Sequence, residues 1–270
     1  MKIESSILTR IIRSINITDS SMSSMFEDFY SQINLLSLTQ NKFVALNKPL
    51  VMITESLWDI ETVLYRIDWL NNGVLNKNLD NNWYLFSKSD IRLFHIELRS
   101  LLDHLGLFIK NLVPSKNKPK DSFHALRSNV EKYFKLNIID QKIYLIINSA
   151  SWFDDFSVIR DKIVHNGATI STFFQYPGDP IMFSIGKYYF DSLVFDKDFI
   201  IGKNNLLNFE RYAAFYMAHI YNLLDEIIKW AYQVTNLKFD NSMECRRSHP
   251  GIQTVYNWLV DLENYLSDKK

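Results

Sequence analysis

Apolar side chains recur at helical spacing along most of this 270-residue chain, and this spacing limits its fold more than any other feature. Between residues 90 and 112 the steps alternate between three and four, at Ile91, Phe94, Leu98, Leu101, Leu105, Phe108 and Leu112. Such steps place one apolar stripe along an amphipathic helix. The same pattern predicts helices over 50–67, 122–134, 141–148, 151–163, 206–232 and 252–266, and the first forty residues are also helix-like.

Local signals predict where some of these helices begin and end. We expect Asn47 to cap a helix that has Pro49 in its first turn and that stops at Gly73. The pair Asn166 and Gly167 is expected to end the helix that begins near residue 151. Four tryptophans lie within these helical patterns and are predicted to be core residues: Trp58, Trp69, Trp152 and Trp230.

Residues 171–199 depart from the helical pattern. They are rich in Thr, Phe, Tyr, Ile and Val, and the run Tyr-Pro-Gly-Asp-Pro over 176–180 interrupts them. Ile181, Phe183 and Ile185 alternate with a period of two, which is typical of a β-strand. The segment therefore predicts a small β-hairpin or a three-stranded meander.

Taken together, these patterns predict an all-α protein with a β insertion at about 171–200. Its 7 glycines and 6 prolines are too few for the many tight turns of a β-sandwich or propeller. We expect three parts along the chain: an N-terminal helical extension over 1–45, a helical bundle over 46–240 and a C-terminal helix over 241–270.

Composition excludes several classes of function. Cys245 is the only cysteine, which excludes a disulfide framework and any multi-cysteine zinc or iron–sulfur site. Thirty basic and thirty acidic residues cancel, so a nucleic-acid partner would need a local basic patch. No apolar run approaches the roughly 20 residues that cross a bilayer. We therefore expect a cytoplasmic protein without membrane contact, and we predict no metal and no cofactor.

The segment 159–167 carries the residues best suited to chemistry. Asp161 and His165 are four residues apart, so they share a helix face and are expected to form a hydrogen bond. That bond and the helix C-terminus both favour the charged imidazole. Arg160 lies five residues from His165, about 140° away around an ideal helix. One helix is therefore not expected to aim both groups at one atom, whereas two copies related by a two-fold axis could do so.

Arg160, four intervening residues and the pair His165-Asn166 resemble the signature of the HEPN (higher eukaryotes and prokaryotes nucleotide-binding) superfamily. Asp161 matches the polar position that follows the arginine in that signature. The segment 97–104 resembles the helix that packs beside the motif helix in this family. The resemblance covers roughly residues 50–232 and does not account for the first forty residues or for the β insertion.

The resemblance implies a HEPN-like antiparallel helical bundle that forms a homodimer and cleaves RNA without a metal. It implies that His165 moves a proton when a ribose 2′-hydroxyl attacks the neighbouring phosphate, and that Arg160 stabilises the phosphate charge. Asp161 would orient His165, and Asn166 would position backbone or substrate. Such a protein could be a toxin or an antiviral defence effector with an inhibitory protein partner. The alternative is a non-catalytic helical dimer that binds nucleotide, RNA or a protein.

Other residues are candidates for supporting roles. Glu97 or Asp103 is expected to lie beside Arg160. Lysines of the loop 113–120 are candidate contacts to RNA phosphates, although such loops are also common as solvated surface: Lys116, Lys118 and Lys120.

A purely structural interpretation of the motif also stays open. His165 can serve as a helix C-cap residue, because a histidine at that end is electrostatically favourable. Arg160 can pair with Asp154 or Asp155 instead of a substrate.

Overall fold

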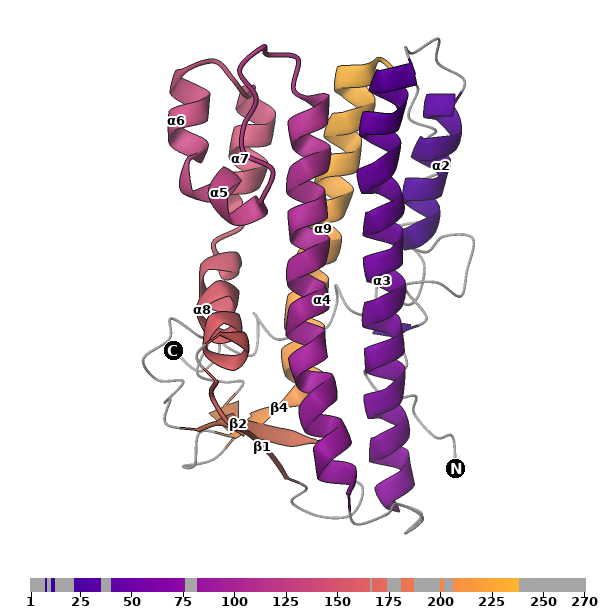
Figure 1. The fold of residues 1–270 in the computed structure, drawn as a ribbon, viewed down its shortest axis with the longest axis vertical. Helices are drawn as coiled ribbons and strands as arrows, with labels where there is room; N and C mark the ends of the chain where they lie inside the picture. Colours follow the sequence, from indigo (N-terminus) through magenta and orange to yellow (C-terminus); the bar gives the residue numbers. More distant parts are fainter. Residues whose placement is uncertain are drawn as a thin grey trace, which may run out of the picture.

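Long helices lie side by side along the length of the molecule, and shorter helices and a small sheet flank them (Figure 1). The computed structural model describes residues 8, 11–12, 22–34, 40–75, 82–165, 167–173, 181–186, 200–201 and 206–237. Its helices are α2 (Met22–Asn34), α3 (Gln40–Leu75), α4 (Trp83–Leu112), α5 (Phe123–Ser128), α6 (Val130–Lys135), α7 (Gln141–Ser149), α8 (Trp152–Val164) and α9 (Phe209–Thr235). Its strands are β1 (Ile170–Phe173), β2 (Met182–Ile185), β3 (Ile200–Ile201) and β4 (Leu206–Asn208). A mostly helical fold is thereby confirmed.

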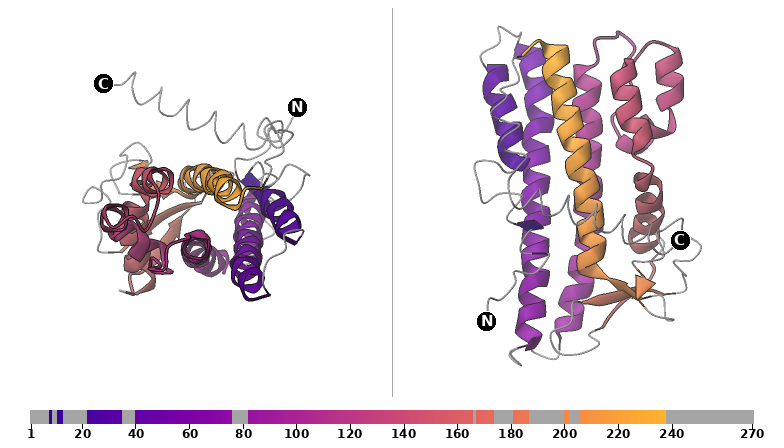
Figure 2. Two further views of the ribbon diagram at one scale, coloured as in Figure 1. Left: turned by 90° about the horizontal axis from the view of Figure 1, so that it is seen from above. Right: turned by 180° about the vertical axis from the view of Figure 1, so that it is seen from behind.

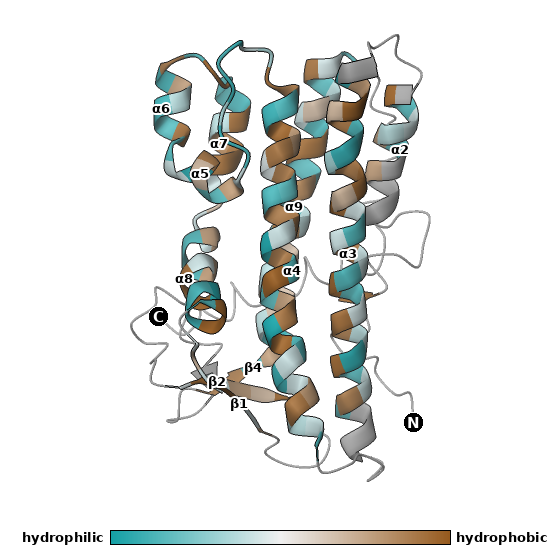
Figure 3. Cartoon of the chain, in the orientation of Figure 1, coloured by the Kyte–Doolittle hydropathy of each residue, from teal (hydrophilic) through white to brown (hydrophobic). Residues whose placement is uncertain are grey.

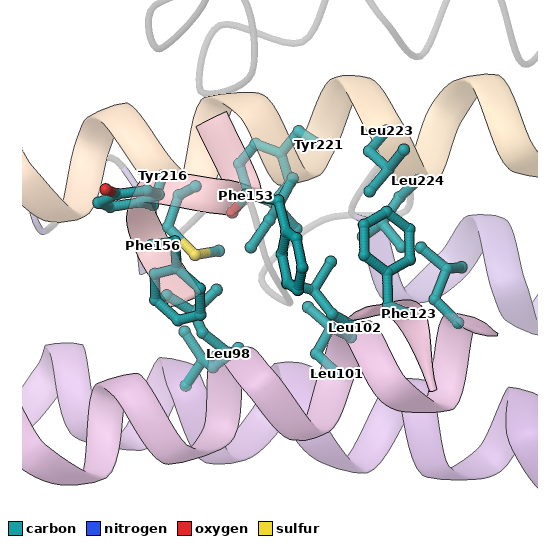
Figure 4. Packing of buried hydrophobic residues seen from close by; sticks show 14 of the residues in the cluster. Leu98, Leu101, Leu102, Phe123, Phe153, Phe156, Tyr216, Tyr221, Leu223 and Leu224 are labelled. Carbon is teal, nitrogen blue, oxygen red and sulfur yellow. The ribbon is translucent and has the colours of Figure 1, made fainter. Parts of the chain in front are cut away.

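The core forms where the predicted apolar stripes of the long helices meet. Ile91, Phe94, Leu98, Leu101, Leu105 and Phe108 of α4 are all fully buried, as their spacing predicts. Viewed from above, α3, α4 and α9 are neighbours, and α5–α8 lie on the side of α4 away from α3 (Figure 2). Aromatic rings from α5 and α8, among them Phe123, Phe153 and Phe156, fill the space between α4 and α9 (Figure 4).

The N-terminal part shares this core. Phe26, Phe29 and Ile33 of α2 are buried in the same cluster as the bundle residues, and so is Ile11. Helix α3 begins at Gln40, so the domain boundary expected between residues 45 and 46 falls inside a helix. The expected C-terminal helix over 241–270 lies outside the described residues.

The start predicted for α3 is wrong, because Pro49 lies inside the helix rather than in its first turn. A proline has no N–H to donate to the carbonyl four residues earlier, here that of Ala45. The side-chain amide of Asn111 on α4 donates a hydrogen bond to that carbonyl instead. The contact with α4 therefore satisfies the group that the proline leaves unpaired, and α3 continues through it.

Three other local predictions also fail. The helix runs past Gly73 to Leu75. The segment 122–134 forms two short helices that break at Asn129, whose side-chain amide donates to the Ala125 carbonyl. Such a bond competes with the backbone of a helix. Trp58 and Trp69 are about half exposed, whereas the other two tryptophans are buried as predicted.

The β insertion is a four-stranded antiparallel sheet with the order β1-β2-β4-β3, rather than a hairpin or a three-stranded meander. Strand β4 was not expected, because its residues fall in the segment 206–232 that the sequence predicts as helix. That helix begins at Phe209, where the Asn208 side chain accepts a hydrogen bond from the Arg211 N–H. Phe183 lies opposite Leu207 and both are buried, so the sheet packs onto the end of the bundle. The proline-containing loop over 176–180 lies outside the described residues.

Asn71 joins α3, the sheet and α9 at this end of the bundle. Its side-chain N–H donates to Glu210 Oε1 at 3.1 Å, and its Oδ1 accepts from the Ile181 N–H at 3.3 Å. Burial, together with the charge of Asp68, raises the pKa of Glu210 from 4.5 to about 7. The folded protein therefore holds this carboxyl in its neutral form at pH values where the unfolded chain has released the proton.

Replacing Glu210 with Gln is expected to stabilise the protein in neutral and alkaline solution. Between about pH 4.5 and 7 the folded state binds a proton that the unfolded state has lost, so stability falls as the pH rises. Gln cannot ionise and keeps an oxygen for the Asn71 N–H. We expect Glu210→Gln to raise the free energy of unfolding by about 1–3 kcal/mol near pH 8 and to leave it unchanged near pH 4. Urea unfolding of both proteins across this range measures the difference, and an equal offset at all pH values would contradict a neutral Glu210.

Candidate functional site

Helix α8 carries the arginine–histidine motif, and its packing fixes where the motif lies. Phe153, Phe156, Ile159 and Ile163 form its buried face. Beyond the helix, Gly167 has the positive φ of 62° expected of a helix stop, and the Ala168 N–H returns to the Lys162 carbonyl. The chain then enters β1 directly. The C-terminal end of α8 is thus held by the core on one side and by the sheet on the other.

Arg160 is the central residue of this helix end. Its side chain is only 18% exposed. One guanidinium nitrogen, Nη1, lies 3.0 Å from Asp161 Oδ1 and also contacts His165 Nε2. Its Nε is buried and has no hydrogen-bond partner in the part of the chain that the structure describes. Arg160 therefore binds both motif neighbours and keeps one buried donor unused.

The expectation that one helix does not bring Arg160 and His165 together is wrong, because the two side chains meet within one chain. Helix α8 ends at Val164, and His165 at the C-cap keeps helical backbone angles and donates its N–H to the Asp161 carbonyl. The long side chain of Arg160 spans the gap to His165. A second copy is consequently not required to bring the two groups together.

The expected hydrogen bond between Asp161 and His165 is also absent, since Asp161 Oδ1 and His165 Nε2 are 4.0 Å apart. Asp161 accepts from Arg160 instead. A guanidinium has only donors, so a contact with His165 Nε2 requires that nitrogen to be an acceptor. Asp161 and His165 are therefore joined through the Arg160 guanidinium rather than by a direct hydrogen bond. The imidazole is 61% exposed and is open to solvent.

Helix α4 carries two further arginines on one side, and one of them, Arg99, contacts α8. Arg99 donates to Asp103 and to Ser157 of α8, and its guanidinium lies 5.2 Å from the centroid of the Phe153 ring. Arg92 is seven residues earlier, on the same side of α4, about 10 Å along the axis. Its Nε is buried and has no partner within the described ranges. We call Arg92, Arg99 and Arg160 the arginine seam.

His95 lies on α4 next to the arginine seam and is fully buried. Its Nδ1 lies 2.7 Å from the Ile91 carbonyl and its Nε2 lies 2.6 Å from the Tyr212 hydroxyl. Burial, together with the charge of Arg160, lowers the pKa of His95 to about 4, and the hydrogen bond with the Ile91 carbonyl opposes this shift only in part. His95 therefore supports the core behind Arg160 as a neutral ring, so the seam draws its positive charge from its arginines.

Several predicted site residues are not brought to Arg160. Asp103 pairs with Arg99. Burial, together with the charge of Asp59 on α3, raises the pKa of Glu97. The candidate substrate-binding lysines Lys116, Lys118 and Lys120 are exposed in the loop that follows α4. That loop lies at the opposite end of α4, roughly 25 Å along the helix axis from His95. Asn166 lies outside the described residues.

The candidate site is a helix end rather than a pocket. One cavity of about 530 Å³ is lined by Trp230, and another of about 450 Å³ by Trp152 and His219. Neither is lined by Arg160 or His165. Within the described ranges, no three His, Cys, Asp or Glu side chains are grouped so that they could hold a metal ion. None of the helices in that part of the chain has the length and apolar character needed to cross a membrane.

Comparisons with models of known families, with curated proteins and with solved structures found no match.

Proposed function

We propose that this protein is a metal-independent endoribonuclease of the HEPN type, with Arg160 and His165 as its catalytic residues. The observation that carries the proposal is the contact between a largely buried arginine and an exposed histidine at the end of α8. The guanidinium can bind a phosphate, and the adjacent imidazole nitrogen can accept a proton.

In this proposal a bound RNA phosphate takes the place of His165 at the Arg160 guanidinium. His165 Nε2 is then free to accept the proton of the ribose 2′-hydroxyl. The 2′-oxygen bonds to phosphorus, the bond from phosphorus to the 5′-oxygen breaks, and the leaving oxygen takes a proton from water. The products are a 2′,3′-cyclic phosphate and a 5′-hydroxyl. Arg160 stabilises the charge that builds up on the phosphate oxygens during this step.

The arginine seam supports RNA as the partner in a chain without net charge. Arg92 and Arg160 each hold a buried Nε–H with no partner among the described residues. Guanidinium groups bind phosphates through paired N–H donors. Asp161 is proposed to hold Arg160 in place rather than to orient His165, because its hydrogen bond goes to the arginine.

The broader roles that follow from the resemblance belong to the same proposal. They are a cytoplasmic homodimer that acts as a toxin or antiviral defence effector and is restrained by an inhibitory protein. The alternative function is a non-catalytic helical module that binds nucleotide, RNA or protein. One observation favours this alternative: Arg160 already occupies His165 Nε2 and is itself paired with Asp161. RNA binding without cleavage would support the non-catalytic module.

Replacing Arg160 with Ala is expected to slow RNA cleavage by about tenfold to a hundredfold. A single charge-stabilising donor is often worth more than this, but Arg92 and Arg99 remain to bind the phosphate. Asp161→Asn should cost less than tenfold, because an amide oxygen can still accept from Arg160. End-labelled RNA of mixed sequence, incubated with each protein in excess EDTA, measures these rates. Arg211→Ala is the matched control, because Arg211 is exposed on α9. Equal rates for Arg160→Ala and this control would contradict the assignment.

A further inference from the structure

Helix α3 presents a row of large apolar side chains to solvent. Val44, Val51, Trp58 and Tyr65 follow one another at seven-residue intervals and are 55%, 45%, 45% and 63% exposed. Trp69, one turn beyond Tyr65, is 58% exposed. We call these five residues the α3 outer stripe. Isolated apolar residues are common on protein surfaces, but a continuous row of this kind is not.

The spacing of the stripe is that of a helix–helix seam. A seven-residue repeat keeps side chains on one face of a helix, with a drift of only about 20° per repeat. From Val44 to Trp69 the stripe extends over roughly 37 Å. The core-facing residues of α3, such as Ile53, Leu57 and Ile60, are fully buried on the other side of the helix. Apolar residues thus recur on more than one face along α3 (Figure 3), which is typical of a helix packed on two sides.

The exposed area of the stripe matches that of a stable interface. A covered aromatic side chain buries about 150–250 Å², so three half-exposed aromatics and two valines offer roughly 400 Å² of apolar surface. Two such stripes placed together would bury about 800 Å². A standard interface buries about 1,200–2,000 Å², and slightly more than half of that area is apolar. The roughly 800 Å² of two paired stripes therefore matches the apolar area of such an interface.

We propose that the occupant of the α3 outer stripe is the same stripe of a second copy, related by a two-fold axis. In such an interface one patch meets itself, so one row of residues can supply both sides. Helix α3 lies on the side of α4 away from α8 (Figure 1), so this pairing leaves both motif ends open to solvent. The proposal does not rest on the proposed RNA cleavage, and it differs from a dimer in which the two α8 helices face each other.

Sedimentation or light scattering of the full chain at about 5–50 µM tests this pairing. The wild type is expected to have twice the 31.9 kDa mass of one chain. Trp58→Glu and Tyr65→Glu, each made separately, are expected to return the mass to that of one chain, because either places a charge within the stripe. Leu145→Glu is the matched control, since Leu145 is an exposed apolar residue of α7 away from the stripe. It should keep the doubled mass.

Circular dichroism and thermal unfolding establish that each variant is folded. We expect both variants to fold, because the side chains that they replace are half exposed in the wild type. A wild type with the mass of one chain over this concentration range would overturn the proposal and leave the stripe to another segment or partner. A doubled mass that persists in both Trp58→Glu and Tyr65→Glu would overturn it as well, and would place the dimer interface elsewhere.

Discussion

His165→Ala is expected to slow RNA cleavage by about 10²–10⁴-fold, the range in which positioned proton transfer contributes to enzyme rates. Alanine removes the only imidazole that Arg160 contacts within the described residues. RNA binding should change much less, because the arginine seam is intact. The side chain of His165 is largely exposed, so the variant should fold and unfold as the wild type does. Single-turnover cleavage in EDTA and a separate binding measurement distinguish these effects.

His124→Ala is the matched control for this experiment. His124 is an exposed histidine of α5, well away from the end of α8. Its removal should leave the cleavage rate unchanged. If His165→Ala cleaves RNA as fast as the control, His165 is not the general base, and the proposed chemistry at the end of α8 is wrong.

Gly106→Ala is expected to lower the free energy of unfolding by about 1–4 kcal/mol, although alanine favours helix formation by about 1 kcal/mol over glycine. A Cβ at Gly106 would lie 2.8 Å from both the Asp121 carbonyl oxygen and the Phe123 nitrogen. Both are backbone atoms, so neither can rotate away. Helix α4 would have to separate from the turn that begins α5, where Asp103 accepts a hydrogen bond from the Phe123 N–H. Such overpacking generally costs about 1–3 kcal/mol, and the loss of this hydrogen bond adds to it.

Ser100→Ala provides the comparison on the same helix. The Ser100 hydroxyl donates to the Ile96 carbonyl, a bond within α4 that is not needed for packing. We expect this variant to match or slightly exceed wild-type stability. Urea unfolding followed by circular dichroism measures both. Stabilisation by Gly106→Ala would contradict the close approach of α4 to residues 121–123.

Periodicity predicted the parts of the fold that depend on one helix at a time. The stripe of α4 is buried as its spacing indicates, and α7 and α8 lie where their patterns place them. The failures arise where another element decides the outcome. Nothing around Pro49 in the sequence reveals that Asn111 satisfies the Ala45 carbonyl, so the helix start was placed too late. Trp58 has the helical spacing of a core residue, but its side chain is about half exposed.

The candidate site was predictable as a set of residues but not as an arrangement. The motif identified Arg160 and His165, yet angles on an ideal helix ignore the reach of a long arginine side chain, which contacts His165. The partner of Asp161 was misassigned for the same reason. Arg92 and Arg99 were missed as members of the site. Their seven-residue spacing was a signal that both share a face, but only the packing of α4 on α8 shows which neighbour that face meets.

Cleavage of an RNA that contains a single 2′-deoxyribose tests the central claim most directly. The account predicts that the wild-type protein, in excess EDTA, cuts the all-ribose strand and leaves 2′,3′-cyclic phosphate ends. In the substituted strand, cutting should disappear on the 3′ side of the deoxyribose and persist at all other positions. Cutting at the deoxyribose with undiminished rate would contradict the account, because that position has no 2′-hydroxyl from which His165 could take a proton.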